Sequence, residues 1–190
     1  RGRATMSVEM ACTHAQRTVD FLMEIGLDIE IVPGSSGFVS GINIHEGALH
    51  VDPGAKASNL LHEAGHLAIV PSRFRGYLSG NLAHGMERIF AELEAEGTAP
   101  DAPVLRAMMQ TGDTEATAWA WAAGKALDLP EEEIIRSSEY GGEGDCIRFM
   151  LSQRAYIGIH GISHAGFCLL RGTSLRKGPI YPQMAFWLQH

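Results

Sequence analysis

Apolar side chains recur every three or four positions over three stretches of the chain, which is the spacing of a helix with a buried face. Residues 8–27 predict an amphipathic N-terminal helix. Residues 56–70 are apolar on most sides and end at Pro71, so they predict a second helix that lies in the core. Residues 114–129 are rich in alanine and end before Pro130, and they predict a third helix.

Residues 29–51 change from helical spacing to short apolar runs that glycine and proline separate. Such runs predict two or three strands, and the last two, within residues 38–51, favour a hairpin. Helices before and after a short group of strands are typical of an α+β fold. We therefore expect a small mixed or antiparallel sheet of three to four strands that packs against helices.

A length of 190 residues is typical of one domain, so we expect a single domain over residues 1–190. Residues 71–112 are polar, hold two helical pieces at 86–96 and 103–110, and indicate an insertion or a lid. Residues 145–190 are apolar with glycines interspersed, and they predict a helical tail.

The charge balance argues against direct binding to nucleic acid. The chain has 15 Lys and Arg residues against 22 Asp and Glu residues, which gives a net charge of −7. Non-specific binding to a phosphate backbone needs a basic surface, and this composition does not supply one.

We expect a cytoplasmic protein without a membrane partner, because no apolar run approaches the roughly 18 residues that span a bilayer and no signal segment stands at the N-terminus. Residues 1–5 precede Met6, which could be the natural start. The three cysteines, at positions 12, 146 and 168, are odd in number and form no C-x-x-C pair. That pattern argues against a disulfide framework and favours a reducing compartment. Nothing in the sequence indicates an oligomeric state.

Nine histidines in 190 residues direct attention to metal chemistry, and two of them form the pattern His62-Glu63-x-x-His66 inside the predicted core helix. Positions four apart lie about 40° apart around a helix, so both imidazoles can reach one zinc ion. Glu63 lies beside that ion, where a carboxylate can take a proton from an attacking water. A chance match is disfavoured because a core helix would otherwise hold these polar groups at a desolvation cost.

A catalytic zinc bound by two histidines needs a third protein ligand and one open position. Glu115 is the preferred candidate, because it opens a helix of small residues that can pack closely on the H-E-x-x-H helix. Its alternative role is to complement the helix dipole. Asp113 is the second candidate, with an N-terminal cap as its alternative role.

Two motifs resemble the ImmA/IrrE group of zinc peptidases over roughly residues 38–130: His62-Glu63-Ala64-Gly65-His66, and Glu115-Ala116-x-x-Trp119-Ala120 with a Leu-Pro stop after it. The resemblance implies a zincin-like active-site helix pair of the gluzincin type. It also implies zinc on His62, His66 and Glu115, with Glu63 as general base. The chain departs from the family pattern at Thr117, where asparagine is usual, and at Trp119, where phenylalanine is usual.

These residues predict zinc-dependent hydrolysis of an amide bond in a peptide or protein substrate. Four residues are candidates to stabilise the oxyanion: Tyr140, Tyr156, His160 and His164. The last three recur at intervals of four, so in a helix they would share one face. Ordinary packing of that segment is an equal alternative. The edge of the hairpin within 42–51 is expected to bind an extended peptide by strand addition.

Two other functions remain open from the sequence. One is a metal-bound regulatory or partner-binding domain that keeps the fold without hydrolysis. The other is a metal hydrolase that acts on a non-peptide amide. Glu63 argues against the first, because a purely structural zinc needs no neighbouring base.

Overall fold

The computed structural model describes residues 9–172, 175 and 177–190. The expected leader before Met6 lies outside the described residues. The elements in chain order are α1 (Thr13–Glu24), β1 (Ile29–Ile31), β2 (Ile42–His45), β3 (Ala48–Val51), α2 (Ala57–Ile69), the 3-10 helix η1 (Ser72–Tyr77), α3 (Leu82–Ala95), α4 (Pro103–Met108), α5 (Asp113–Ala126), α6 (Glu131–Ile134), the 3-10 helix η2 (Tyr140–Gly142), α7 (Gly144–Ser152) and α8 (Gly158–His164).

The strands form one mixed sheet in the order β1-β3-β2 within the described part of the chain. β1 runs parallel to β3, and β2 and β3 form an antiparallel hairpin. Glu46 and Gly47 make its two-residue turn with positive φ angles of 47° and 81°, as a tight hairpin requires. Both the α+β class and the hairpin are confirmed.

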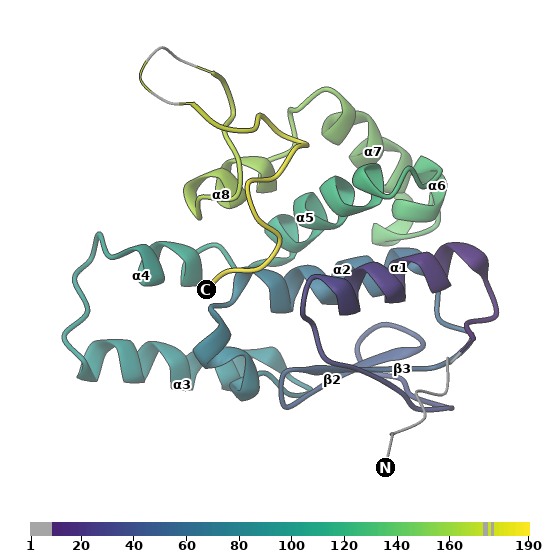
Figure 1. Ribbon diagram of the computed structural model, residues 1–190, viewed down its shortest axis with the longest axis horizontal. Helices are drawn as coiled ribbons and strands as arrows, with labels where there is room; N and C mark the ends of the chain where they lie inside the picture. Colours follow the sequence, from purple (N-terminus) through teal and green to yellow (C-terminus); the bar gives the residue numbers. More distant parts are fainter. Residues whose placement is uncertain (1–8, 173–174, 176) are drawn as a thin grey trace.

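α2 is the central helix of the molecule. Figure 1 shows α1 and α2 on one face of the sheet and α5 across α2 on the side away from the strands. α8 and α6 pack on α5 in turn. α3 and α4 extend to one side of this body (Figure 1), where an insertion or lid is expected from residues 71–112.

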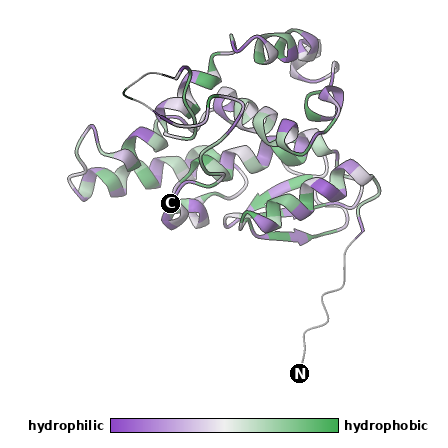
Figure 2. Cartoon of the chain, turned by 45° about the horizontal axis from the view of Figure 1, so that its top comes forward, coloured by the Kyte–Doolittle hydropathy of each residue, from purple (hydrophilic) through white to green (hydrophobic). Residues whose placement is uncertain are grey.

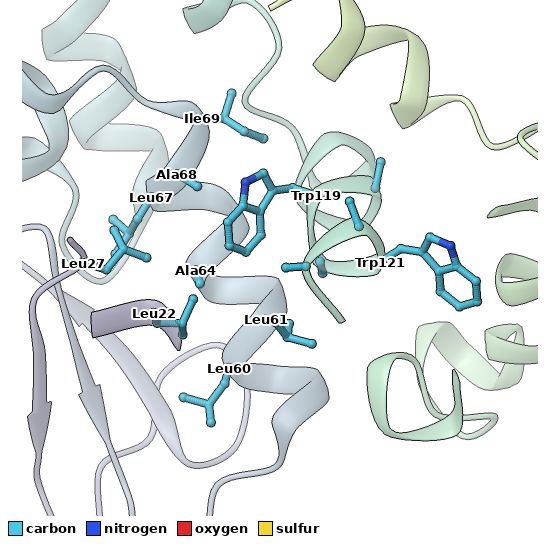
Figure 3. Packing of buried hydrophobic residues seen from close by; sticks show 14 of the residues in the cluster. Leu22, Leu27, Leu60, Leu61, Ala64, Leu67, Ala68, Ile69, Trp119 and Trp121 are labelled. Carbon is cyan, nitrogen blue, oxygen red and sulfur yellow. The ribbon is translucent and has the colours of Figure 1, made fainter. Parts of the chain in front are cut away.

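The core explains why α2 is apolar on most sides. Leu60, Leu61 and Leu67 are fully buried, and Figure 3 shows Trp119 of α5 against α2, whereas Trp121 points away from it. Figure 2 shows hydrophobic residues along the strands beneath. A helix covered by a sheet on one side and by helices on the other has little surface left for polar side chains. The presence of His62, Glu63 and His66 on this largely buried helix therefore needs an explanation.

Several element boundaries differ from the expectation, most clearly at the two ends of the chain. The N-terminal helix begins at Thr13, because Cys12 has extended backbone angles. The C-terminal tail is helical only as far as His164. Beyond it the described residues form no further helix, and the segment is held by a bridge between Leu169 and Ile180. In the described residues, no helix has both the length and the apolar character needed to cross a membrane.

Candidate metal centre

The two histidines of the H-E-x-x-H pattern lie one turn apart on α2, as the spacing predicts. Their ring centroids are 4.9 Å apart and the rings are nearly perpendicular, at 86°. The side chain of His62 is 16% exposed and that of His66 is 9% exposed. Both imidazoles are thus largely withdrawn from water while their Nε2 atoms face the same acceptor.

That acceptor is Asp113, the first residue of α5. Its Oδ1 atom lies 3.2 Å from Nε2 of His66 and 3.9 Å from Nε2 of His62. Ligand atoms about 2.1 Å from a tetrahedral zinc are separated from one another by roughly 3.4 Å. The ligand atoms of these three residues all lie within 4.8 Å of one another, so the donor set fits one zinc ion with little rearrangement.

A glycine on α2 permits this arrangement. A Cβ atom at Gly65 would lie only 2.6 Å from the carbonyl oxygen of Ala116. The absence of a side chain at Gly65 therefore lets the backbones of α2 and α5 approach closely. The approach occurs beside His66 and brings the first turn of α5 to the histidine pair.

Glu115, the preferred third ligand from the sequence, lies on another side of α5. Residues two apart in a helix point about 200° apart around its axis, so Asp113 and Glu115 cannot both face α2. Glu115 accepts a hydrogen bond of 2.9 Å from the Thr114 hydroxyl and lies against Gly161 of α8. The structure thus brings the second candidate, Asp113, to the histidines and directs Glu115 toward α8.

Glu63 is a buried carboxylate beside the three candidate ligands. The residue is 7% exposed and lines a cavity of about 800 Å³ together with His66 and Asp113. Burial raises the pKa of Glu63; His66 opposes this rise and Asp113 adds to it. A carboxyl group with a raised pKa at a cavity wall is suited to accept and return a proton.

The far side of the His62 ring contacts two hydroxyl groups. Nδ1 of His62 lies 3.4 Å from the Thr117 hydroxyl and 3.3 Å from the Tyr140 hydroxyl, and these two hydroxyls are 2.9 Å apart. An N–H at Nδ1 that donates to them leaves Nε2 unprotonated toward Asp113. Burial and, secondly, His66 lower the pKa of His62 to about 4, so the ring is neutral near pH 7, as a metal ligand must be.

The three oxyanion candidates that are spaced four residues apart do not share one helix face. α8 begins at Gly158, so Tyr156 precedes the helix. Tyr156 lines a cavity of about 380 Å³ with His62 and Asp113. His160 and His164 line a different cavity of about 610 Å³ together with Glu115. Tyr156 alone of the three therefore lies at the candidate metal centre.

Phe38 is a residue at the site that the sequence motifs did not indicate. Phe38 and Asp113 line both the 800 Å³ and the 380 Å³ cavities, which therefore adjoin at the candidate metal centre. Phe38 is 98% exposed, the highest value among the large apolar side chains of the described residues. Its position between Gly37 and Val39 in a turn-rich segment offered no periodic signal. Tyr140, one of the oxyanion candidates, also lies at the site, where it lines the 380 Å³ cavity from a glycine-rich break.

Comparisons of the chain with models of known families, with curated proteins and with solved structures found no match. The resemblance to the ImmA/IrrE peptidases therefore rests on the two sequence motifs and stays a prediction.

Proposed function

We propose that the protein is a zinc-dependent peptidase in which His62, His66 and Asp113 hold the metal and Glu63 is the general base. The observation that carries this proposal is a buried carboxylate, Glu63, at a cavity wall next to a two-histidine, one-carboxylate cluster. A structural metal site needs no neighbouring carboxylate that could act as a base. In a chance cluster, nothing would offset the desolvation cost of burying the Glu63 carboxylate.

The donor set fits zinc by its chemistry. Two neutral imidazoles and one carboxylate are the ligands of many catalytic zinc sites, and three protein ligands leave one position open. Thr117 and Tyr140 support the assignment because zinc-bound histidines typically donate their other N–H to an oxygen. The arrangement resembles the zincin type expected from the sequence, with Asp113 in place of Glu115.

A zinc ion held there would polarise the scissile carbonyl and activate water for attack. Glu63 accepts the proton of the attacking water and transfers it to the departing amine nitrogen. Thr117 and Tyr140 keep the His62 ring in one orientation during the cycle.

The adjoining cavities favour an extended substrate over a small amide. They meet at Phe38 and Asp113, so a chain can cross the metal centre from one cavity to the other. The exposed ring of Phe38 gives that chain an apolar contact. The two cavities do not form a single closed pocket, which is the shape that would favour a small substrate.

Full strand addition at β2 is disfavoured. The Ile44 carbonyl already accepts a 2.8 Å hydrogen bond from Gly80, and Gly37 lies so close to the Ile42 carbonyl that a Cβ there would be 2.8 Å from it. The outer edge of β2 is therefore partly covered. We expect the substrate to lie in the cavity, beside Asn43 and Phe38, and not along the whole strand.

The test compares three forms of the full chain: wild type, Glu63→Gln and Glu94→Gln. Glu94 is an exposed carboxylate near the end of α3, so its substitution controls for a change of one charge. Zinc content is measured by elemental analysis, and cleavage is measured on a library of unstructured peptides.

We expect one zinc per chain in all three proteins. Cleavage should fall by about 100-fold or more in Glu63→Gln, which is the usual effect of losing a general base, and should be unchanged in Glu94→Gln. A wild-type protein without stoichiometric zinc, or equal cleavage by wild type and Glu63→Gln, would contradict the proposal. Zinc without any cleavage would favour the regulatory alternative.

A further inference from the structure

A second group of metal-ligating side chains lies on elements that do not form the candidate metal centre. Cys12 is the N-cap of α1, His14 is in the first turn of the same helix, and Glu133 is in α6. One ligand atom from each lies within 4.8 Å of the other two. The Nδ1 atom of His14 is 3.9 Å from Oε2 of Glu133.

We propose that Cys12, His14 and Glu133 form a second site for a borderline-soft transition-metal ion of the zinc class. Thiolate, imidazole and carboxylate are the three protein ligand types that zinc accepts, and a thiolate disfavours magnesium and calcium. The Cys12 thiol releases its proton to solvent when it binds. The thiolate supplies one full negative charge, and the Glu133 carboxylate supplies a second that it shares with the ion pair to Arg136.

Glu133 is held in place for this role. Both of its carboxylate oxygens accept hydrogen bonds from Nη2 of Arg136, at 3.0 and 2.9 Å. Carboxylates that bind metals are commonly oriented by such contacts. The side chain of Glu133 is 21% exposed and that of His14 is 35% exposed, whereas Cys12 is exposed. The cluster is thus open to an entering ion.

A metal ion bound by this cluster would link two helices, α1 and α6. α1 and α6 both pack on α2 but lie far apart in the sequence. A metal bound by residues from both would join them and restrict the ends of the helices that flank α2. No local sequence pattern indicates this cluster, because Cys12 and His14 are separated from Glu133 by more than a hundred positions.

Cobalt is the appropriate probe, since a cobalt ion bound to a thiolate gives a sulfur-to-metal charge-transfer absorption that histidine and carboxylate ligands do not. The full chain is titrated with Co²⁺ in a non-thiol reductant as wild type, Cys12→Ser, His14→Ala and Cys146→Ser. Cys146 is another exposed cysteine and lies outside the cluster, so it is the matched control.

We expect the charge-transfer band in wild type and Cys146→Ser, with a final intensity of about one thiolate-bound cobalt per chain, and its loss in Cys12→Ser and His14→Ala. The melting temperature should rise with cobalt in wild type by an increment that Cys12→Ser loses in part. Absence of the band in wild type, or its persistence in Cys12→Ser or His14→Ala, overturns the proposed site.

A His62→Ala/His66→Ala variant separates this proposal from the peptidase proposal. It removes the two imidazoles of the candidate centre, which has no cysteine among its three ligands, and should keep the thiolate band. If that variant fails to fold, the band in wild type and its loss in Cys12→Ser still decide the question, because the signal reports thiolate ligation alone.

Discussion

Oδ1 of Asp113 lies 3.2 Å from Nε2 of His66, and the two residues come from different helices that touch where α2 has a glycine. A hydrogen bond from His66 lowers the pKa of Asp113, although its partial burial opposes the effect. The carboxylate is therefore ionised and oriented before any metal binds. This contact distinguishes Asp113 from Glu115 as the candidate for the third ligand.

The first prediction compares these two acids directly. Asp113→Ala removes a proposed ligand and should weaken zinc binding by at least about 100-fold, since even the loss of a supporting residue costs 10–100-fold. Glu115→Ala removes a side chain that faces α8 and should keep stoichiometric zinc. Zinc affinity is measured by competition with a chelator of known affinity.

The reverse result would restore the ligand set implied by the motif resemblance. If Glu115→Ala lost zinc and Asp113→Ala kept it, α5 would have to rotate when the metal binds. The Asp113 side chain is 79% exposed, so its truncation should leave the fold intact, and circular dichroism checks that both variants are folded.

The second prediction concerns the hydroxyl pair behind His62. Tyr140→Phe and Thr117→Val each remove an oxygen that can accept the Nδ1 proton of His62. Each variant should weaken zinc binding by about 10-fold, and the double variant by about 100-fold at most, because ring orientation and ligand basicity are lost together.

Tyr77→Phe is the control for this prediction. The Tyr77 hydroxyl donates a 2.7 Å hydrogen bond to Glu92 on α3, so its loss should leave zinc affinity unchanged. Equal zinc affinity in wild type, Tyr140→Phe and Thr117→Val would show that His62 needs no such support.

The spacing in the sequence predicted that His62 and His66 lie close together, and they do, because both belong to one helix in which residues four apart share a face. The third ligand depends on how another helix is rotated against the first. That rotation is set by the contact of Gly65 with Ala116 and by the start of α5 at Asp113, one residue earlier than expected. Neither is visible in a pattern of apolar positions.

A similar limit explains the C-terminal residues. The spacing of Tyr156, His160 and His164 predicted a shared face only if all three were helical. Tyr156 instead precedes the helix. The oxygen that reaches His62 comes from Tyr140, in a break where glycines obscure any period. Local pattern therefore predicted α2 and the hairpin, whereas the partners that complete the site required the packing of distant segments.

The third prediction tests the close approach of α2 and α5. In Gly65→Ala, the new methyl group would meet the backbone at Ala116, which cannot move aside as a flexible side chain can. We expect an overpacking cost of about 3 kcal/mol, at the upper end of the usual range, and a gain of about 1 kcal/mol in helix propensity. The net loss of about 2 kcal/mol is measured by denaturant unfolding.

Gly76→Ala is the matched control, since no atom lies within 4 Å of a Cβ placed at that exposed position. Gly76→Ala should change the free energy of unfolding by much less than Gly65→Ala does. Zinc affinity should also fall in Gly65→Ala, because a shift of α5 moves Asp113 away from the histidines. A Gly65→Ala protein of wild-type stability and affinity would mean that the helices tolerate a wider separation.

The segment that carries Phe38 is anchored by one carboxylate. Asp52 accepts hydrogen bonds from the backbone N–H groups of Gly34, at 2.6 Å, and Gly54, at 2.7 Å. The backbone N–H of Asp52 also donates to Gly41 at the other end of the segment. Asp52 therefore fixes both ends of the segment that lies between the two cavities.

These hydrogen bonds to Gly34 and Gly54 lower the pKa of Asp52 below 3.8, and a lowered pKa makes stability depend on pH in a definite direction. Asp52 contributes fully to folding stability above its unfolded-state pKa of 3.8, and this contribution is lost as the pH falls through the lower folded-state pKa.

We expect Asp52→Asn to be less stable than wild type at pH 7 and to lose less stability than wild type on acidification below about pH 4. Asp101→Asn, an exposed residue between α3 and α4, should follow the wild-type curve in urea unfolding across this range. Parallel curves for wild type and Asp52→Asn would show that Asp52 does not anchor the segment. If it does, peptide cleavage should also fall in Asp52→Asn while zinc content stays the same, because Phe38 is displaced and the metal ligands are not.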